Sequence, residues 1–170
     1  MGTLLIRKTF MPKDFWLNLN KRVIKQQQLP TFNMKPHLPN CQECFEDYVN
    51  SLEELRELIV EVKHKDNLEK FRPEIIRLFE SSHEKALDTM RTYFREQGRP
   101  PFSGSRDITI EAFHEDLIDD GQGWLDMIIA RIQYNPLYPG DYLGSFSENI
   151  VKKYFSLLEN FERNYAKMSK

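Results

Sequence analysis

The strongest candidate for chemistry in the sequence is Arg131, which stands in the apolar segment WLDMIIARIQYNPLYPGD, residues 124–141. At helical spacing it shares a face with Trp124, Met127 and Ile128. An arginine on such a face needs a partner, because burying an unpaired charge is costly. Two interpretations follow. Arg131 binds a phosphate or a partner's carboxylate at the mouth of a groove, or it pairs with a carboxylate of another helix and fixes the packing.

Two carboxylates that could meet Arg131 lie on the longest expected helix. Glu80 falls on the apolar stripe of that helix, four residues after Ile76, and Glu84 lies one turn further on. An acidic residue on an apolar stripe needs a reason. We expect Glu80 to neutralise Arg131 or His83; alternatively, Glu80 and Glu84 line a polar groove with Arg131. His83 shares the stripe and is interpreted as a satisfied core residue.

Aromatic residues follow Arg131 closely in the chain. Tyr134, Tyr138 and Tyr142 flank the loop that comes after it. Aromatic rings beside a cation can stack on a nucleobase. They can equally cap the end of a helical bundle, which is the simpler interpretation. The candidate binding groove comprises Arg131, Glu80, Glu84, Trp124, Asp126, Tyr134 and Tyr138.

Two patterns in the chain could hold a metal. Cys41 and Cys44 form a C-x-x-C with His37 upstream, but a structural zinc site needs four ligands and no second pair is present. Acidic residues also crowd one region, where a turn and a helix start explain them: Glu111, Glu115, Asp116, Asp119, Asp120 and Asp126. We therefore expect reduced thiols, and neither a metal nor a cofactor.

The bulk composition describes an ordinary globular chain. Its 170 residues are 40% hydrophobic and 29% charged, which suits one domain with a small appendage. No run of eighteen apolar residues exists, and the first ten residues do not resemble a signal peptide, so we expect a cytoplasmic protein without a membrane span.

Charge divides the chain into two predicted parts. Residues 1–40 carry seven Lys or Arg and one acidic residue, Asp14, and form a basic arm with a proline-rich linker. Residues 41–170 have a net charge of −8 and are predicted to form the folded domain. A basic arm on an acidic body is expected to contact an acidic partner, nucleic acid or the body itself.

Helical periodicity dominates the sequence, and no strand signal stands out. Apolar stripes predict helices over about 43–63, 68–96, the segment with Trp124, and from about Ser145 onward, where Ser145 and Glu148 have the spacing of a capping box. Shorter helices are expected at 14–28 and 106–118. The predicted fold is all-α: an antiparallel up-and-down four-helix bundle with a short extra helix and the N-terminal arm.

A series of short motifs resembles the nucleotidyltransferase substrate-binding family, a branch of the HEPN helical bundles. The order and gaps fit over about residues 42–168. The matching features are Arg77, Phe79, Glu80, Glu84, Ala86, Tyr93 and Gly98 in the long helix, then Ser105-Arg106, EAF at 111–113, LI at 117–118, and WLDM at 124–127 followed by Arg131.

The resemblance implies a helical bundle that forms a homodimer and works beside a separate small nucleotidyltransferase, which supplies the catalytic carboxylates and the metal. The bundle would bind that enzyme or its substrate, a nucleotide or RNA. The transferase signature, Gly-Ser followed by paired aspartates on a strand, is absent from this chain. Related HEPN proteins are ribonucleases of toxin–antitoxin pairs, with an arginine followed after a short gap by a histidine.

The chain departs from that ribonuclease motif. After Arg131 it reads IQYNP, with Asn135 and Pro136 where relatives have a polar loop and the histidine, although Tyr138 keeps the aromatic that follows. Proline cannot exchange a proton. The sequence therefore predicts a non-catalytic binding subunit with no catalytic residues of its own. The alternatives are a HEPN-like ribonuclease toxin with an altered motif and a generic helical oligomerisation module.

Overall fold

The structure is a computed structural model that describes residues 38–134 and 142–168. Within those ranges the ordered elements are all helices, as expected, and none of them combines the length and apolar character needed to cross a membrane. The predicted helix at 14–28 and most of the basic arm lie outside the described residues. The division at residues 40 and 41 stays a prediction.

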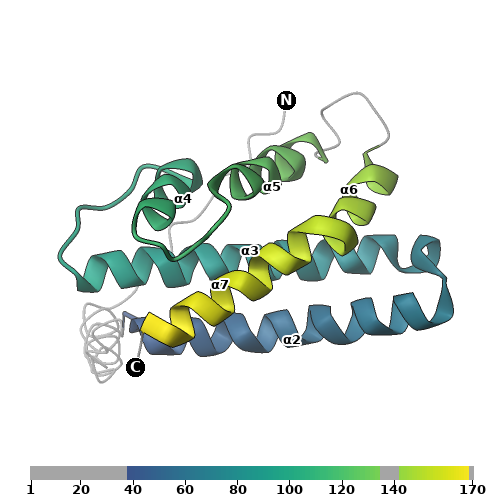
Figure 1. The fold of residues 1–170 in the computed structure, drawn as a ribbon, viewed down its shortest axis with the longest axis horizontal. Helices are drawn as coiled ribbons and strands as arrows, with labels where there is room; N and C mark the ends of the chain where they lie inside the picture. The colour runs from purple at the N-terminus through teal and green to yellow at the C-terminus, as the bar shows by residue number, and fades with distance from the viewer. Residues whose placement is uncertain (1–37, 135–141, 169–170) are drawn as a thin grey trace, which may run out of the picture. The chain divides into compact units, whose positions relative to one another are not determined.

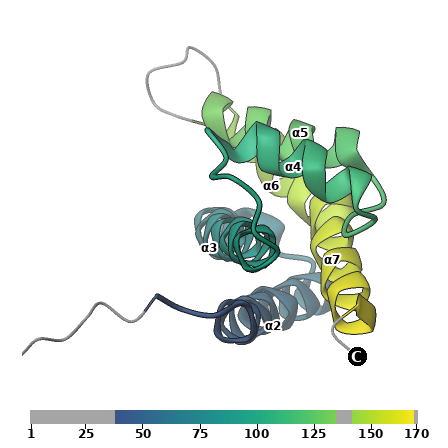
Figure 2. The same cartoon turned by 90° about the vertical axis from the view of Figure 1, so that its left-hand side faces the viewer.

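A long helical hairpin forms the base of the domain. Helix α2 (Cys41–Lys65) and helix α3 (Leu68–Glu96) lie side by side and run in opposite directions (Figures 1 and 2). The side chain of Asn40 caps α2 by accepting from the backbone N–H of Glu43, whose carboxylate accepts from the Asn40 N–H in return. Gly98, which is followed by Pro100 and Pro101, predicts the end of this helix. With φ +77°, Gly98 turns the chain just beyond α3 and confirms that prediction.

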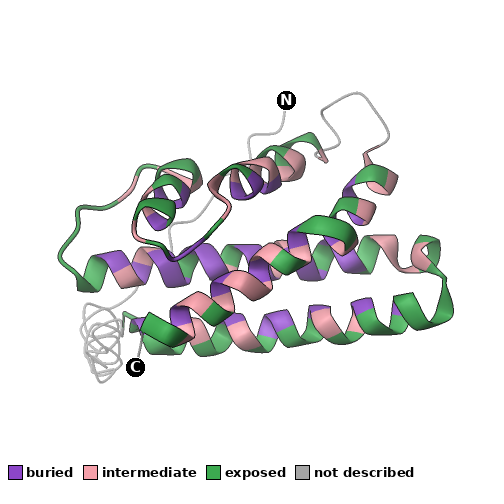
Figure 3. Cartoon of the chain, viewed as in Figure 1, coloured by how far each residue is buried: buried purple, intermediate pink, exposed green. Residues whose placement is uncertain are grey.

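The predicted apolar stripes of this hairpin are confirmed. Residues buried at three- and four-residue spacing on both helices belong to one core. Figure 3 shows the corresponding alternation of buried and exposed residues along α2 and α3. The fully buried members are Tyr48, Leu52, Leu55, Ile59 and Val62 of α2 and Ile76, Phe79, Leu87, Met90 and Phe94 of α3. Phe45 is only partly buried, but it packs against the same core.

Two short helices lie above α3 (Figures 1 and 2): α4 (Ser105–His114) and α5 (Gly121–Gln133). The predicted end of α4 at residue 118 is wrong, because Asp116 has φ +56° and breaks the helix. The next two residues are still buried. Asp120 starts α5 by accepting a hydrogen bond of 2.8 Å from the Gly123 N–H, so this acid caps a helix.

The C-terminal part is a rod that crosses the hairpin. It consists of α6 (Leu143–Asn149), a π-helical turn η1 (Ile150–Tyr154) and α7 (Phe155–Met168). The predicted capping box at Ser145 is wrong: α6 begins two residues earlier, and the Ser145 hydroxyl donates to the Tyr142 carbonyl. The Glu148 carboxylate instead accepts from the Lys152 ammonium.

The periodicity of the C-terminal segment predicts a buried apolar stripe of Ile150, Tyr154, Leu157, Phe161, Tyr165 and Met168. The structure differs from this prediction at two positions. Leu158, not Leu157, is fully buried beside Phe161 and Tyr165. Leu157 instead faces α5, since its Cδ1 would lie 2.7 Å from a Cβ at Gly123. Met168, at the last residue of α7, is exposed. The rest of the predicted stripe, Ile150, Tyr154, Phe161 and Tyr165, is confirmed.

Candidate functional site

Arg131 lies near the C-terminal end of α5 and faces α3. One guanidinium nitrogen, Nη1, lies 2.8 Å from His83 Nδ1 and 3.2 Å from Glu84 Oε2. The side chain keeps 26% of its surface exposed, so the positive charge is partly desolvated but still reachable. The expectation that Glu80 is the mate of Arg131 is wrong: within the described part of the chain, its carboxylate partner is Glu84, one helical turn further along.

His83 is the buried support of this arginine. Because a guanidinium can only donate, Nδ1 must accept, and the ring proton resides on Nε2. Nε2 is buried and has no hydrogen-bond partner among the described residues. The ring lies parallel to Phe79, with centroids 5.8 Å apart, and 5.6 Å from the Trp124 ring. Burial, reinforced by the charges of Arg131 and Arg91, lowers the pKa of His83 to about 3.

The neutral His83 ring therefore accepts a hydrogen bond from Arg131 and holds the guanidinium group in one orientation. A base whose lone pair already accepts from Arg131, and whose ring is buried, is poorly placed to exchange a proton with a bound molecule. The predicted interpretation of His83 as a core residue agrees with its burial. Its hydrogen bond to Arg131 was not foreseen, because the two residues are 48 positions apart.

A surface pocket of about 400 Å³ opens at this arginine, and we call it the Arg131 pocket. A second cation, Arg91, shares Glu84 with Arg131 at 3.5 Å and also contacts Asp88 at 2.6 Å. Two guanidinium groups around one exposed carboxylate can bind an anion that takes the place of Glu84. The lining residues are Glu80, His83, Glu84, Leu87, Arg91, Ser105, Ile128, Arg131 and Ile132.

The other predicted groove residues that the structure describes do not line this pocket. Trp124 is 1% exposed and belongs to the core. Asp126 accepts from Gln122 at 2.8 Å and from Lys153 at 3.2 Å, on a different face of α5. Tyr134 packs near Phe146, with ring centroids 5.5 Å apart. Tyr138 lies outside the described residues. The structure thus brings Arg131, Glu80 and Glu84 together at one pocket, which Trp124 and Asp126 do not line.

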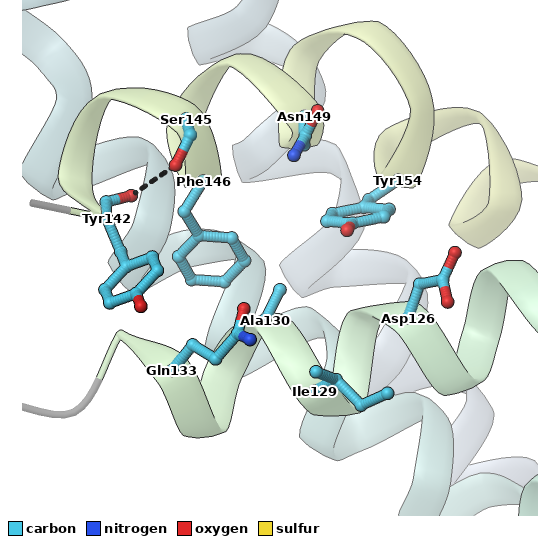
Figure 4. Close-up of a pocket in the computed structure, with 9 residues that line it drawn as sticks. All are labelled: Asp126, Ile129, Ala130, Gln133, Tyr142, Ser145, Phe146, Asn149 and Tyr154. Atoms are coloured by element: carbon cyan, nitrogen blue, oxygen red, sulfur yellow. Dashed lines mark hydrogen bonds between the residues drawn. The ribbon is translucent and has the colours of Figure 1, made fainter. Parts of the chain in front are cut away.

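A second cavity, of about 230 Å³, lies on that other face of α5, between α5 and the rod (Figure 4). We call it the Tyr154 pocket. Sequence analysis named Asp126 and Tyr142 but missed most of its lining, because the way the rod packs beside α5 determines which residues face the cavity. The lining residues are Asp126, Ile129, Ala130, Gln133, Tyr142, Ser145, Phe146, Asn149 and Tyr154.

The two cysteines are buried in the core as free thiols. Cys41 Sγ accepts from the Tyr165 hydroxyl at 2.8 Å, and Cys44 Sγ lies 3.5 Å from Thr92 Oγ1. Burial raises the pKa of Cys41 to about 11. Among residues 38–134 and 142–168, no group of three metal-ligating side chains is gathered. His37 lies outside these ranges.

The acidic run is used within the fold. Glu111 and Glu115 both accept from Arg99, and Asp119 accepts from Asn160 and Asn164. These contacts tie α4 to the end of α3, and the turn before α5 to α7. The run therefore has a structural explanation in the described part of the chain.

We expect the stability of the protein to depend on His83 below pH 6.5. The unfolded chain binds a proton near pKa 6.5, whereas the native ring stays neutral down to about pH 3. Stability is thus lost as pH falls through this window, by about 2 kcal/mol at pH 5. His83→Phe removes this loss. Urea unfolding at pH 7 and pH 5 measures it, with the exposed His114→Gln as control. Equal pH dependence of His83→Phe and wild type would contradict the burial of a neutral ring.

Comparison with known proteins gives one family. A family model described as "Nucleotidyltransferase substrate binding protein like" matches residues 43–168, which covers the helices from α2 to α7. No curated protein matches the sequence. The matched range agrees with the extent of the resemblance predicted from the motifs and includes both pockets.

Proposed function

Because the chain belongs to the nucleotidyltransferase substrate binding protein like family, we propose that it is a non-catalytic binding subunit. It associates with a separate nucleotidyltransferase, binds the nucleotide or nucleic-acid substrate of that enzyme, or does both. The up-and-down four-helix arrangement and a homodimer are part of this proposal. The family description supports the substrate-binding role and the partner enzyme.

The observation that carries the proposal is the hydrogen bond from Arg131 to a buried, neutral His83. It holds a partly exposed cation in one orientation without neutralising it, since the acceptor has no charge. The charge partner, Glu84, is half-exposed and shared with Arg91, so a bound phosphate can replace it. Such a preorganised cation suits binding, and it needs no proton transfer.

Exposed apolar side chains supply surface for a protein partner. Four large ones, between 39% and 51% exposed, lie on α4 and α5: Ile110, Phe113, Ile129 and Ile132. Apolar groups left in water favour association with another surface. This feature supports docking of the partner enzyme or of a second copy.

The test uses pyrophosphate and ATP, titrated calorimetrically into the full chain at low salt. We expect Arg131→Ala to weaken binding about 10- to 100-fold, because it removes a charge-assisted contact. Arg77→Ala is the matched control, because it also removes an arginine that pairs with a glutamate. Arg77 lies on the exposed side of α3, where it pairs with Glu74, and it does not line the Arg131 pocket. If Arg131→Ala and Arg77→Ala change the affinity for pyrophosphate or ATP equally, Arg131 is not the binding site.

The partner role needs a second measurement. A nucleotidyltransferase encoded beside this chain is expected to co-purify with it, and light scattering of the free chain is expected to give the mass of a dimer. If the enzyme does not co-purify and the free chain has the mass of a monomer, the proposed partner role is contradicted. RNA cleavage that depends on Arg131 would then support the ribonuclease alternative.

A further inference from the structure

The Tyr154 pocket has aromatic walls on one side. The rings of Tyr142, Phe146 and Tyr154 project from the rod toward α5, and Ile129 and Ala130 face them from α5 (Figure 4). Flat apolar walls of this kind suit a flat ligand, because ring faces gain most from stacked contact. The volume of about 230 Å³ lies below the range for a whole drug-sized ligand. It therefore fits one ring system of a larger molecule.

The rim and the inner wall carry hydrogen-bonding groups that the fold does not use. The amides of Gln133 and Asn149 make no hydrogen bond to another residue in the described ranges, and neither does the hydroxyl of Tyr154. The Tyr154 ring is nearly buried, with 6% of the residue exposed, and its hydroxyl opens onto the cavity. A polar group that faces a cavity and has no partner in the fold can bind a ligand.

The π-helical turn explains why Asn149 and Tyr154 line the same pocket. In an α-helix, residues five apart lie about 140° apart around the axis. The wider turn of η1, Ile150–Tyr154, forms i→i+5 hydrogen bonds and brings such residues closer together on one side. Single π turns cost stability and occur often at functional sites. The π turn thus lies beside the same cavity as the polar side chains of Asn149 and Tyr154 that have no hydrogen-bond partner in the described ranges.

The charge of the pocket limits what it can hold. None of its lining residues is a lysine or arginine, and Asp126 adds a carboxylate that Lys153 contacts at 3.2 Å. An anionic group is therefore disfavoured here, in contrast to the Arg131 pocket. An amide offers a donor and an acceptor side by side, which matches the edge of a heterocyclic base.

We propose that the Tyr154 pocket binds a nucleobase, stacked on the partly exposed ring of Tyr142, with its edge read by Asn149, Gln133 and the Tyr154 hydroxyl. This inference rests on the proposed binding function and names the part of the substrate recognised on this face of α5. The neutral base and the anionic phosphates are recognised by two different pockets.

The experiment uses nucleosides, which carry a base and no phosphate. Adenosine, guanosine, cytidine and uridine are each titrated into the full chain, and binding is followed by saturation-transfer NMR and calorimetry. At least one is expected to bind. Asn149→Ala and Tyr154→Phe are expected to weaken it about 3- to 10-fold, the range for one neutral hydrogen bond. Tyr154→Phe removes only an oxygen, so the core ring stays in place.

The controls match the variants in residue type. Asn50→Ala changes an exposed asparagine of α2, and Tyr93→Phe changes a partly buried tyrosine of α3 that does not line the pocket. Both should bind the nucleoside like the wild type. Absence of nucleoside binding, or equal weakening in variants and controls, overturns the inference. Pyrophosphate carries no base and tests only the Arg131 pocket, whereas a nucleoside carries no phosphate and tests only the Tyr154 pocket. The two proposals can therefore be contradicted independently.

Discussion

Replacing Trp124 by alanine is expected to lower the free energy of unfolding by about 3–5 kcal/mol, the largest single effect we predict for the core. The indole is 1% exposed and meets Phe161 edge to face, with centroids 5.9 Å apart. It also borders His83, so its loss opens a cavity beneath Arg131. Urea unfolding followed by circular dichroism measures the change.

Two control variants show whether the expected loss of stability comes from removing a buried side chain at position 124. Trp124→Phe keeps most of the apolar contact and should cost less than the alanine variant. Ile129→Ala, on the same helix at a side chain that is 50% exposed, should change stability by no more than about 0.5 kcal/mol. A loss of under 1 kcal/mol for Trp124→Ala would show that the indole is not part of the core and would restore it as a groove residue.

The native thiol of Cys41 is expected to react with iodoacetamide at pH 8 at least about 100-fold more slowly than in the unfolded chain. The pKa of Cys41 rises from 9.0 to about 11, which alone reduces the reactive thiolate about 100-fold. Burial of Cys41, which is 3% exposed, slows the reaction further, because the reagent must wait for the N-terminal turn of α2 to open.

Mass spectrometry of alkylated peptides follows each cysteine separately, with the chain in urea as the reference. Tyr165→Phe removes the hydrogen bond to Cys41 but keeps the ring, so it tests the contribution of that contact. Rapid labelling of Cys41, or ready formation of a Cys41–Cys44 disulfide under mild oxidation, would contradict the inert environment and revive the redox interpretation of the C-x-x-C motif.

The sequence was sufficient to predict the two long helices, α2 and α3, whose apolar residues follow uninterrupted helical spacing. The stripe from Tyr48 to Val62 and the stripe from Ile76 to Phe94 have pure helical spacing, so periodicity alone located α2 and α3 and their buried faces. Gly98 marked the end of α3 because it lies at positive φ. These are local properties, which a single segment of sequence contains.

The site could be predicted only in part, because it depends on contacts between helices. Arg131 was recognised as a charge that needs a partner, but which turn of α3 supplies it is set by how α5 docks on α3. That docking selects His83 and Glu84 instead of Glu80. Asn149 had no distinguishing feature in the sequence, since a π turn inserts an irregularity that no apolar periodicity reveals.

The π turn also sets the angular phase between the two parts of the rod. An α-helix advances 100° per residue, so shortening η1 by one residue into an α turn would rotate α6 by about 100° relative to α7. Leu158 and Phe146 are both buried, and with such a rotation only one of them could keep its place. The extra residue of η1 is therefore a spacer that keeps both parts of the rod directed at the hairpin: Phe146 of α6 packs on Phe79 of α3, and Leu158 of α7 stays in the same core.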